Sequence, residues 1–473
     1  GVGTFAASGM MRHATGQGSE QPSIVVILVD DMGYGDPRCY NPQSKIPTPH
    51  IDALAAAGMR FTDAHAGGAV CHPSRYSLLT GCHPFRADTS VWRKQAVIQP
   101  GQATLASVLK SRGYRTAMVG KWHLGCNEDG YDKPLPGGPV DVGFDSFFGI
   151  RASTDIPPYF YIRGNRAVTP PTDHIEANHS EGWSRVQGAF WREGGIAPGL
   201  ELKDVLPRFT DEAIEVIKDH AGAEEPLMLY LAYPSPHTPW LPSKEFEGSS
   251  EAGMYGDFVV MVDAMIGRVL EALETAGMAE NTLLVFSSDN GPVWFDKDVE
   301  RFGHDSSGGL RGMKGDAWEN GHRMPFIVRW PGKVAPGTVS KQTICFTDLM
   351  ATFAGVAGAA LPDDAGPDSF SILPGLLGEQ EEGTPIRGPL VIPSAKGAYS
   401  IRSGPWKFID CPGSGGFLKP ERDKATRDGP EGQLYNLAED LGETVNLYRR
   451  HPEIVPRLEA ELASIRDAAS TRP

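Results

Sequence analysis

The sequence predicts an α/β fold: a large, mostly parallel β-sheet flanked by helices, followed by a smaller C-terminal α+β lobe. Two observations lead to this prediction. Apolar segments of strand length alternate with amphipathic segments of helix length along most of the chain, a pattern typical of a parallel sheet covered on both faces. After a Pro- and Gly-containing stretch at 361–388, short strand-like segments and one amphipathic helix indicate a short antiparallel sheet with a helix.

Four buried strands are expected in the larger unit, at 24–29, 114–119, 227–233 and 282–286. The first is a continuous apolar, β-branched run, as in strands that are buried on both faces. Polar side chains follow each strand closely: Asp30 and Asp31, Lys121 and His123, His237, and Asp289 and Asn290. Because ligands bind beyond the carboxyl ends of parallel strands, we expect these side chains to share one edge of the sheet.

Helices are expected between the strands, at 48–58, 104–112, 210–220 and 258–276. The first begins at Thr48-Pro49, a capping residue followed by proline at the first helical position. The last carries Val262, Met265, Ile266, Val269 and Leu273 on one stripe. In the C-terminal lobe, strands are expected at 399–402, 406–410 and 433–437, and a helix at 452–468.

These segments divide the 473-residue chain into three parts. Residues 1–21 are rich in Gly, Ala, Ser and polar residues without a hydrophobic signal core, so we expect a disordered or processed N-terminal stub. Residues 22–370 are expected to form the catalytic domain. Residues 371–473 are expected to form the C-terminal subdomain.

Composition excludes some classes of protein. The chain has 44 Lys and Arg against 59 Asp and Glu, a net charge of -15, which argues against a nucleic-acid-binding protein. No apolar run is long enough to form a transmembrane segment. The net negative charge does not exclude an anionic small substrate, because the cations that line a pocket determine whether an anion binds there. The six cysteines have no metal-type spacing and no disulfide framework is expected, although a single bridge is left open.

The four acidic and amide residues that follow the first and last strands are a candidate metal site. Asp30, Asp31, Asp289 and Asn290 offer only oxygen ligands, which Ca²⁺ and Mg²⁺ prefer. Either pair alone is equally well explained as turn residues or helix caps. Three carboxylates buried together without a cation would repel one another, so the combination favours a metal.

The candidate cations are Arg75, Lys121, His123, His237 and Lys314. For any one of them, a solvated surface charge or a structural histidine is an ordinary alternative. Arg75 shares a predicted helix with Cys71, which stands at the N-terminus of that helix, where free N–H groups and the helix dipole favour negative charge. Lys314 lies in a glycine-containing segment that lets the backbone approach a ligand closely.

Cys71-His72-Pro73-Ser74-Arg75, followed by Leu79-Thr80-Gly81, resembles the signature of type I sulfatases of the alkaline-phosphatase superfamily. The likeness extends over roughly residues 22 to 450 and includes Gly-Lys-Trp-His-Leu-Gly at 120–125 and Ser-Asp-Asn-Gly at 288–291. His72 departs from the family pattern, in which Ser, Thr or Ala is commoner.

The resemblance implies a mechanism. A formylglycine-installing enzyme would convert Cys71 to Cα-formylglycine, whose hydrate attacks sulfur, after which the sulfated hemiacetal expels sulfate. One Ca²⁺ would be bound by the modified Cys71 together with Asp30, Asp31, Asp289 and Asn290. Arg75 and Lys121 would stabilise the hydrate, and His123 would act as base. His237 would be the general acid, with Lys314 assisting it and contacting sulfate.

The resemblance also implies an exported enzyme, periplasmic or extracellular, that acts on a sulfated small molecule or saccharide. Ser153, Asp155, His304 and Arg93 are the candidate substrate-binding residues, and Asp155 is the preferred specificity determinant because Pro157 and Pro158 stiffen its loop. Two alternatives stay open. A phosphate or phosphonate monoester hydrolase of the same superfamily would share the site, and an inactive carbohydrate-binding relative would share the fold.

Overall fold

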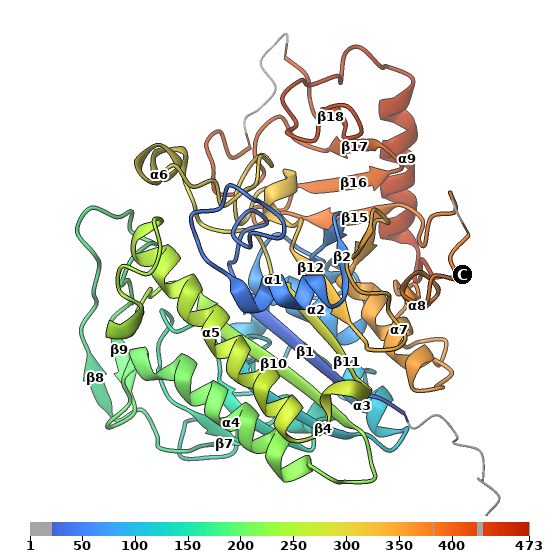
Figure 1. Ribbon diagram of the computed structural model, residues 1–473. Coiled ribbons are helices and arrows are strands. Elements are labelled where there is room, and N and C mark those ends of the chain that lie inside the picture. The colour runs from blue at the N-terminus through green and yellow to red at the C-terminus, as the bar shows by residue number, and fades with distance from the viewer. Residues whose placement is uncertain (1–20, 382, 423–428, 473) are drawn as a thin grey trace, which may run out of the picture.

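The computed structural model describes residues 21–381, 383–422 and 429–472. Apart from Gln21, the predicted N-terminal stub lies outside these residues. The described chain forms a ten-stranded mixed sheet flanked by helices, with a four-stranded antiparallel sheet at its C-terminal end, which confirms the predicted fold class (Figure 1).

Five parallel strands form the centre of the large sheet in the order β11 (Thr282–Ser288), β1 (Ser23–Asp30), β10 (Leu227–Pro236), β4 (Arg115–Lys121) and β5 (Ser146–Ile150). The first four correspond to the four predicted strands. No strand was expected at β5, because its five residues form too short an apolar run to be distinguished from a buried loop.

Antiparallel pairs lie on both sides of this centre. On one side β12 (Phe326–Arg329) pairs with β11 and with β2 (Met59–Phe61), which in turn pairs in parallel with β13 (Thr338–Ser340). On the other side are β6 (Ile162–Arg163) and β7 (Arg166–Ala167). Two further pairs lie apart from the sheet: β3 (Ala64–His65) with β14 (Ile344–Cys345), and β8 (Asp173–Ile175) with β9 (Gly194–Ile196).

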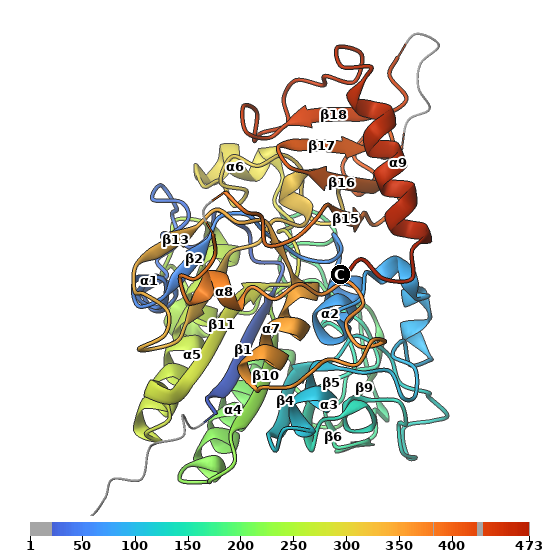
Figure 2. The ribbon, with the colours of Figure 1, turned by 90° about the vertical axis from the view of Figure 1, so that its right-hand side faces the viewer.

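Helices cover both faces of the sheet (Figures 1 and 2). On one face, α1 (Pro49–Ala56), α4 (Val205–His220) and α5 (Gly253–Thr275) pack against Val25, Ile27 and Val29 of β1. On the other face, α2 (Cys71–Thr80), α3 (Leu105–Lys110) and α7 (Leu349–Val356) pack against Ile24, Val26 and Leu28. Since alternate residues of β1 enter opposite cores, none of these six is more than 1% exposed, as expected for a strand buried on both faces.

Two of these helices begin earlier than predicted. α4 begins at Val205 instead of residue 210, and Pro207 lies in its first turn, where proline is tolerated. α5 begins at Gly253 instead of residue 258. Shorter elements include α6 (Asp296–Phe302) and α8 (Leu373–Leu376), and the 3-10 helices η1 (Pro84–Arg86), η2 (Thr89–Arg93), η3 (Pro139–Val142), η4 (Leu202–Asp204), η5 (Lys244–Phe246), η6 (Ala279–Asn281), η7 (Glu319–Gly321) and η8 (Phe346–Asp348).

The C-terminal lobe consists of β15 (Leu390–Pro393), β16 (Tyr399–Ser403), β17 (Trp406–Ile409) and β18 (Gln433–Asn436), with α9 (Ile454–Asp467) packed on one face. The last three strands and the helix were predicted. In Figure 2, α9 lies along this sheet. Val455, Leu458 and Leu462 of α9 form a separate small core with the sheet. The domain boundary at residue 370 stays a prediction, and Ile372 and Leu376 beyond it pack in the core of the large sheet.

All six cysteines lie in the described part of the chain and all are free thiols, so the single bridge left open by the sequence does not form. Within the described residues, no helix has both the length and the apolar character needed to cross a bilayer.

Candidate active site

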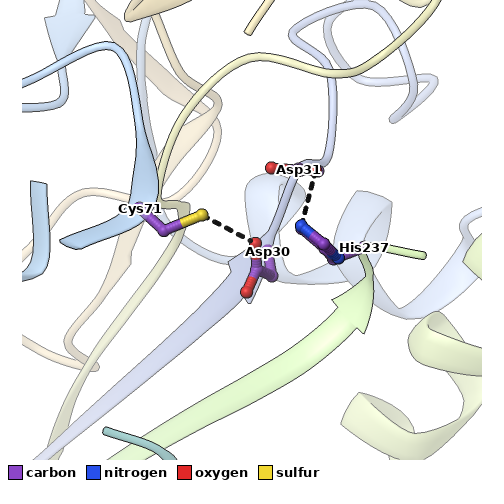
Figure 3. Close-up of side chains that lie close together, drawn as sticks. All are labelled: Asp30, Asp31, Cys71 and His237. Atoms are coloured by element: carbon purple, nitrogen blue, oxygen red, sulfur yellow. Dashed lines mark hydrogen bonds and ion pairs between the residues drawn. The ribbon is translucent and has the colours of Figure 1, made fainter. Parts of the chain in front are cut away.

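The carboxyl ends of the central strands bring the predicted polar residues together. Asp30 ends β1, Lys121 ends β4, and Asp289 follows β11. Cys71 begins α2, and its Sγ lies 3.4 Å from Asp30 Oδ1, while His237 enters from the end of β10 (Figure 3). Ligand atoms of Asp30, Asp31, Cys71 and His237 all lie within 4.8 Å of one another, so residues far apart in sequence form one cluster.

Two residues of this edge have an unusual backbone. Asp31 has a φ of 64° and His123 a φ of 58°, both in the left-handed region that non-glycine residues rarely adopt. Such conformations are maintained where the surrounding structure requires them, often at functional sites. At Asp31 the turn lets consecutive residues both face the cluster, since Asp30 contacts Cys71 and Asp31 contacts Lys314.

Arg75 is the central cation of the cluster and is fully buried. Its guanidinium donates from Nε and Nη2 to Asp289 Oδ2, at 3.0 and 2.8 Å, and from Nη2 to Asp30 Oδ2 at 3.1 Å. A fourth bond runs from Nη1 to the Lys121 carbonyl at 3.1 Å. Lys121 Nζ also donates to Asp30 Oδ2. One guanidinium therefore joins three strand ends, those of β1, β4 and β11.

Lys314 occupies the other side of Cys71. Its Nζ donates to Asp31 Oδ1 and Oδ2, at 2.6 and 2.8 Å, and lies 3.3 Å from Cys71 Sγ. His237 Nε2 lies 3.6 Å from Asp31 Oδ2, and its Nδ1 lies 2.7 Å from the carbonyl of Thr238. Asp31 is therefore a shared neighbour of Lys314 and His237, and Lys314 also reaches the sulfur of Cys71.

Burial and charge shift the titration of these groups. Burial alone would raise the pKa of Asp30, but Lys121, His237 and Arg75 outweigh it and hold that pKa well below its usual range. Burial raises the pKa of the Cys71 thiol, and the carboxylates of Asp289 and Asp30 raise it further. The thiol is therefore protonated at neutral pH. Because the thiolate is the nucleophilic form of cysteine, unmodified Cys71 is poorly suited to attack an ester.

The buried oxygens fit a hard cation. Asn290 donates from Nδ2 to Asp31 Oδ1 at 2.6 Å, while its own Oδ1 is buried without a hydrogen-bond partner among the described residues. A buried amide oxygen without a partner costs free energy that a cation would recover. Carboxylate oxygens of Asp30, Asp31 and Asp289 lie in the same cluster, so the donor set suits Ca²⁺ or Mg²⁺.

His123 lies beside this cluster with both ring nitrogens buried and without partners in the described chain. Its ring contacts the edge of Trp92 at a centroid distance of 4.2 Å. Burial lowers its pKa well below the usual value, and the charge of Lys121 adds to this effect. The imidazole is therefore neutral at physiological pH, and its one unprotonated nitrogen has no partner among the described residues.

Three of the four candidate substrate-binding residues are exposed or have a polar atom without a partner in the described chain. Asp155 is 4% exposed, and its partnerless Oδ1 lies 3.8 Å from His237 Nδ1, while Oδ2 pairs with Arg192. Ser153 Oγ is buried and has no partner among the described residues. Arg93 is exposed, and its guanidinium lies 4.9 Å above the ring of Trp92, the neighbour of His123.

The fourth candidate, His304, has a different environment. Its side chain is fully buried, with Nε2 2.8 Å from Asp36 Oδ1, and its Nδ1 accepts a bond from the Lys45 amide. Since both ring nitrogens are engaged within the protein, His304 offers no group to a substrate and acts as a structural histidine.

One set of residues beside the site was not anticipated from the sequence. Glu319, on the same segment as Lys314, forms a buried charge cluster with Lys407 and Glu443. Lys407 lies 88 residues and Glu443 124 residues after Glu319, so no local motif connects them.

Known proteins with similar sequences are sulfatases, the family that the Cys71 motif resembles. The Sulfatase family model matches residues 22–359. The chain is 34% identical to an N-acetylgalactosamine-6-O-sulfatase of Bacteroides thetaiotaomicron, over 95% of this chain and 94% of the relative. It is 33% identical to human arylsulfatase A, over 90% of this chain and 83% of the relative.

Solved structures lead to the same family. A sulfatase structure from work on the metabolism of multiple glycosaminoglycans by Bacteroides thetaiotaomicron superposes with a TM-score of 0.83 at 31% identity, covering 95% of this chain and all of that one. Family model, relatives and fold agree over most of the chain, and the buried Cys71 cluster lies within the matched region. This protein therefore belongs to the sulfatase family and is an enzyme that hydrolyses sulfate esters.

Proposed function

We propose that this sulfatase removes the 6-O-sulfate of an N-acetylgalactosamine residue in a sulfated saccharide, using a formylglycine made from Cys71 and one Ca²⁺. The observation that carries the mechanism is the position of Cys71, whose sulfur lies between Asp30 and Lys314 in a buried cluster of three carboxylates and three cations. The relative that shares 34% identity over 95% of the chain supports the substrate class.

The chemical state of position 71 is the first part of the proposal. A thiol with a raised pKa in this environment would be a weak nucleophile, which favours conversion to an aldehyde. When formed, the hydrated formylglycine would supply the hydroxyl that attacks sulfur, dividing one difficult displacement into two easier steps. A formylglycine-installing enzyme is therefore an obligate partner in maturation, and we infer that the mature enzyme is exported.

The metal is the second part. Asp30, Asp31, Asp289 and Asn290 would hold the cation together with the modified Cys71, and the buried, partnerless Oδ1 of Asn290 supports this assignment. A bound Ca²⁺ would supply a Lewis acid for the sulfate oxygens.

The third part assigns roles to the charged side chains. Arg75 and Lys121 hold the carboxylates of Asp30 and Asp289 in place and keep positive charge beside position 71, which would stabilise the charged form of the nucleophile. Lys314 Nζ, 3.3 Å from Cys71 Sγ, would neutralise charge on the sulfate.

Proton transfer is assigned to the two histidines. The Thr238 carbonyl lies 2.7 Å from His237 Nδ1, and Nε2 faces the Asp31 carboxylate at 3.6 Å. His237 would donate the Nε2 proton to the leaving alcohol, assisted by Lys314. Neutral His123, whose one unprotonated nitrogen has no partner among the described residues, would accept the proton of the second hydroxyl as the aldehyde is regenerated.

Substrate recognition is assigned to Asp155, Ser153 and Arg93. The free Oδ1 of Asp155 would accept a hydrogen bond from a sugar hydroxyl, because Arg192 engages only the other oxygen. Arg93 is exposed above Trp92 and would contact a charged group farther along the saccharide. A phosphate or phosphonate ester is not favoured as the substrate, because the family and the relatives are sulfatases.

The test is sulfate release from N-acetylgalactosamine 6-sulfate, its 4-sulfate isomer and a matched phosphate ester. The protein is produced in a host that installs formylglycine, and the mass of the Cys71 peptide verifies the conversion. We expect release from the 6-sulfate alone and none from Cys71→Ala, while Cys82→Ala, which alters another buried free thiol, retains activity. Full activity in Cys71→Ala would disprove the mechanism, and release from the 4-sulfate alone would disprove the substrate assignment.

A further inference from the structure

Lys314 lies on a segment with little regular secondary structure of its own. Between α6 and β12, residues 303–325 contain only the three-residue η7, and the flanking Gly312 and Gly315 have φ values of 91° and 89°. Glycine is the most flexible residue in the unfolded chain, so ordering this segment costs more entropy than usual. The position of Lys314 Nζ must therefore depend on tertiary contacts.

The C-terminal lobe supplies many of these contacts. Gly315 accepts a bond at its carbonyl from the Ala395 amide at 2.9 Å. Asp316 Oδ1 accepts bonds from the amides of Phe417 and Leu418, at 2.7 and 3.1 Å. The Ala317 amide donates to the Ser414 carbonyl at 2.7 Å. The three residues that follow Lys314 are thus all bonded to the lobe.

A buried charge cluster continues this attachment. Glu443 Oε2 accepts from the Glu319 amide at 2.6 Å, at the start of η7. Lys407 Nζ lies 2.9 Å from Glu319 Oε1 and 2.9 Å from Glu443 Oε1, and none of the three residues is more than 1% exposed. The main chain of Glu443 has a φ of 52°, in the left-handed region, where glycine would be less strained than glutamate.

The same glutamate also fixes the other end of the segment. Arg311 Nη1 donates to the Glu443 carbonyl at 2.6 Å and to Tyr435 Oη at 3.1 Å. Glu443 therefore contacts the segment on both sides of Lys314, three residues before it and five residues after it.

We propose that Glu443 and Lys407 of the C-terminal lobe are positioning residues that hold Lys314 against Cys71 and Asp31. The inference rests on the proposed function, in which Lys314 contacts the sulfate. Removing Lys407 would leave the carboxylates of Glu319 and Glu443 buried together without the cation between them. Replacing the Glu443 carboxylate would weaken the bond that holds the Glu319 amide, so either change would move the segment. A displacement of about 1 Å at a catalytic group costs on the order of 10²-fold in rate.

The test is a double-mutant cycle between Glu443→Gln and Lys314→Ala, assayed with an activated aryl sulfate so that residual rates are measurable. If Glu443 acts through Lys314, then Glu443→Gln lowers kcat/KM by about tenfold or more in the wild-type background and by less than about twofold in Lys314→Ala, because neighbours that act together are not additive. Glu439→Gln, an exposed glutamate on the same lobe, is the matched control and retains full activity.

Two results would overturn the inference, and they have different consequences for the proposed function. Equal losses from Glu443→Gln in both backgrounds would show a general structural role and leave the proposed function intact. Wild-type activity in Lys314→Ala would remove the catalytic role of Lys314 and the inference with it. If Glu443→Gln does not fold, the same cycle with Lys407→Gln, which changes the other positioning residue, decides by the same criterion.

Discussion

Replacing Arg75 with methionine tests whether the active-site carboxylates depend on this one guanidinium. Methionine has a similar length and no charge, so the variant removes the four hydrogen bonds of Arg75 with little change in volume. Asp289 would lose both guanidinium bonds, and Asp30 would retain Lys121. Breaking a buried ion pair by removing one partner costs about 3–5 kcal/mol, and we expect that decrease in the free energy of unfolding near neutral pH without metal.

The decrease should depend on pH. Burial and the neighbouring Asp30 already raise the pKa of Asp289, and Arg75 opposes that shift. Without Arg75 the native pKa of Asp289 rises further above the unfolded value of about 3.9. The folded variant then binds more protons than the unfolded chain between these two values, so its stability falls as pH rises through that window. The deficit should therefore be smaller at about pH 5 than at about pH 8.

The assay is denaturant unfolding of both proteins in EDTA across this pH range, followed by circular dichroism. Arg457→Met is the control, because Arg457 pairs with Glu461 on the surface of α9 and such exposed pairs contribute about 0–1 kcal/mol. A deficit for Arg75→Met no larger than that of the control would refute the stabilising role of the cluster. A deficit that is the same at all pH values would refute the electrostatic explanation.

Three further predictions concern catalysis and binding. His237→Gln should lower kcat by about 10²–10⁴-fold for a saccharide sulfate and much less for an aryl sulfate, whose leaving group needs no proton. Steady-state rates on both substrates measure this, and equal losses would contradict the general-acid role. Asp155→Asn should raise KM for the saccharide and leave aryl sulfate kinetics unchanged; an unchanged saccharide KM would exclude Asp155 from recognition. Asn290→Leu should weaken Ca²⁺ binding, measured by calorimetry on the metal-free protein, because it removes the partnerless buried oxygen. Binding as tight as in the wild type would place the cation elsewhere.

Local patterns in the sequence were sufficient for most of the fold. The apolar run before Asp30 and the amphipathic helices led to the sheet and to its two covered faces, because burial on both faces requires a continuous apolar strand. β5 was missed because five residues carry too little periodicity. The residues at the carboxyl edge were anticipated for a related reason: parallel strands place their ends together whatever the intervening helices are.

The positions of the strand ends predict which residues gather at this edge, and the resemblance of the Cys71 motif predicts the reaction they belong to. How these residues pair depends on contacts between distant parts of the chain. His123 and His304 are both histidines near polar residues, yet one has both ring nitrogens free and the other has both engaged, which depends on neighbours distant in sequence. The contacts of Glu319, five residues after Lys314, with Glu443 and Lys407 likewise join the Lys314 segment to the C-terminal lobe. Such contacts leave no periodic or local signal, because the partners meet only when the two units pack together.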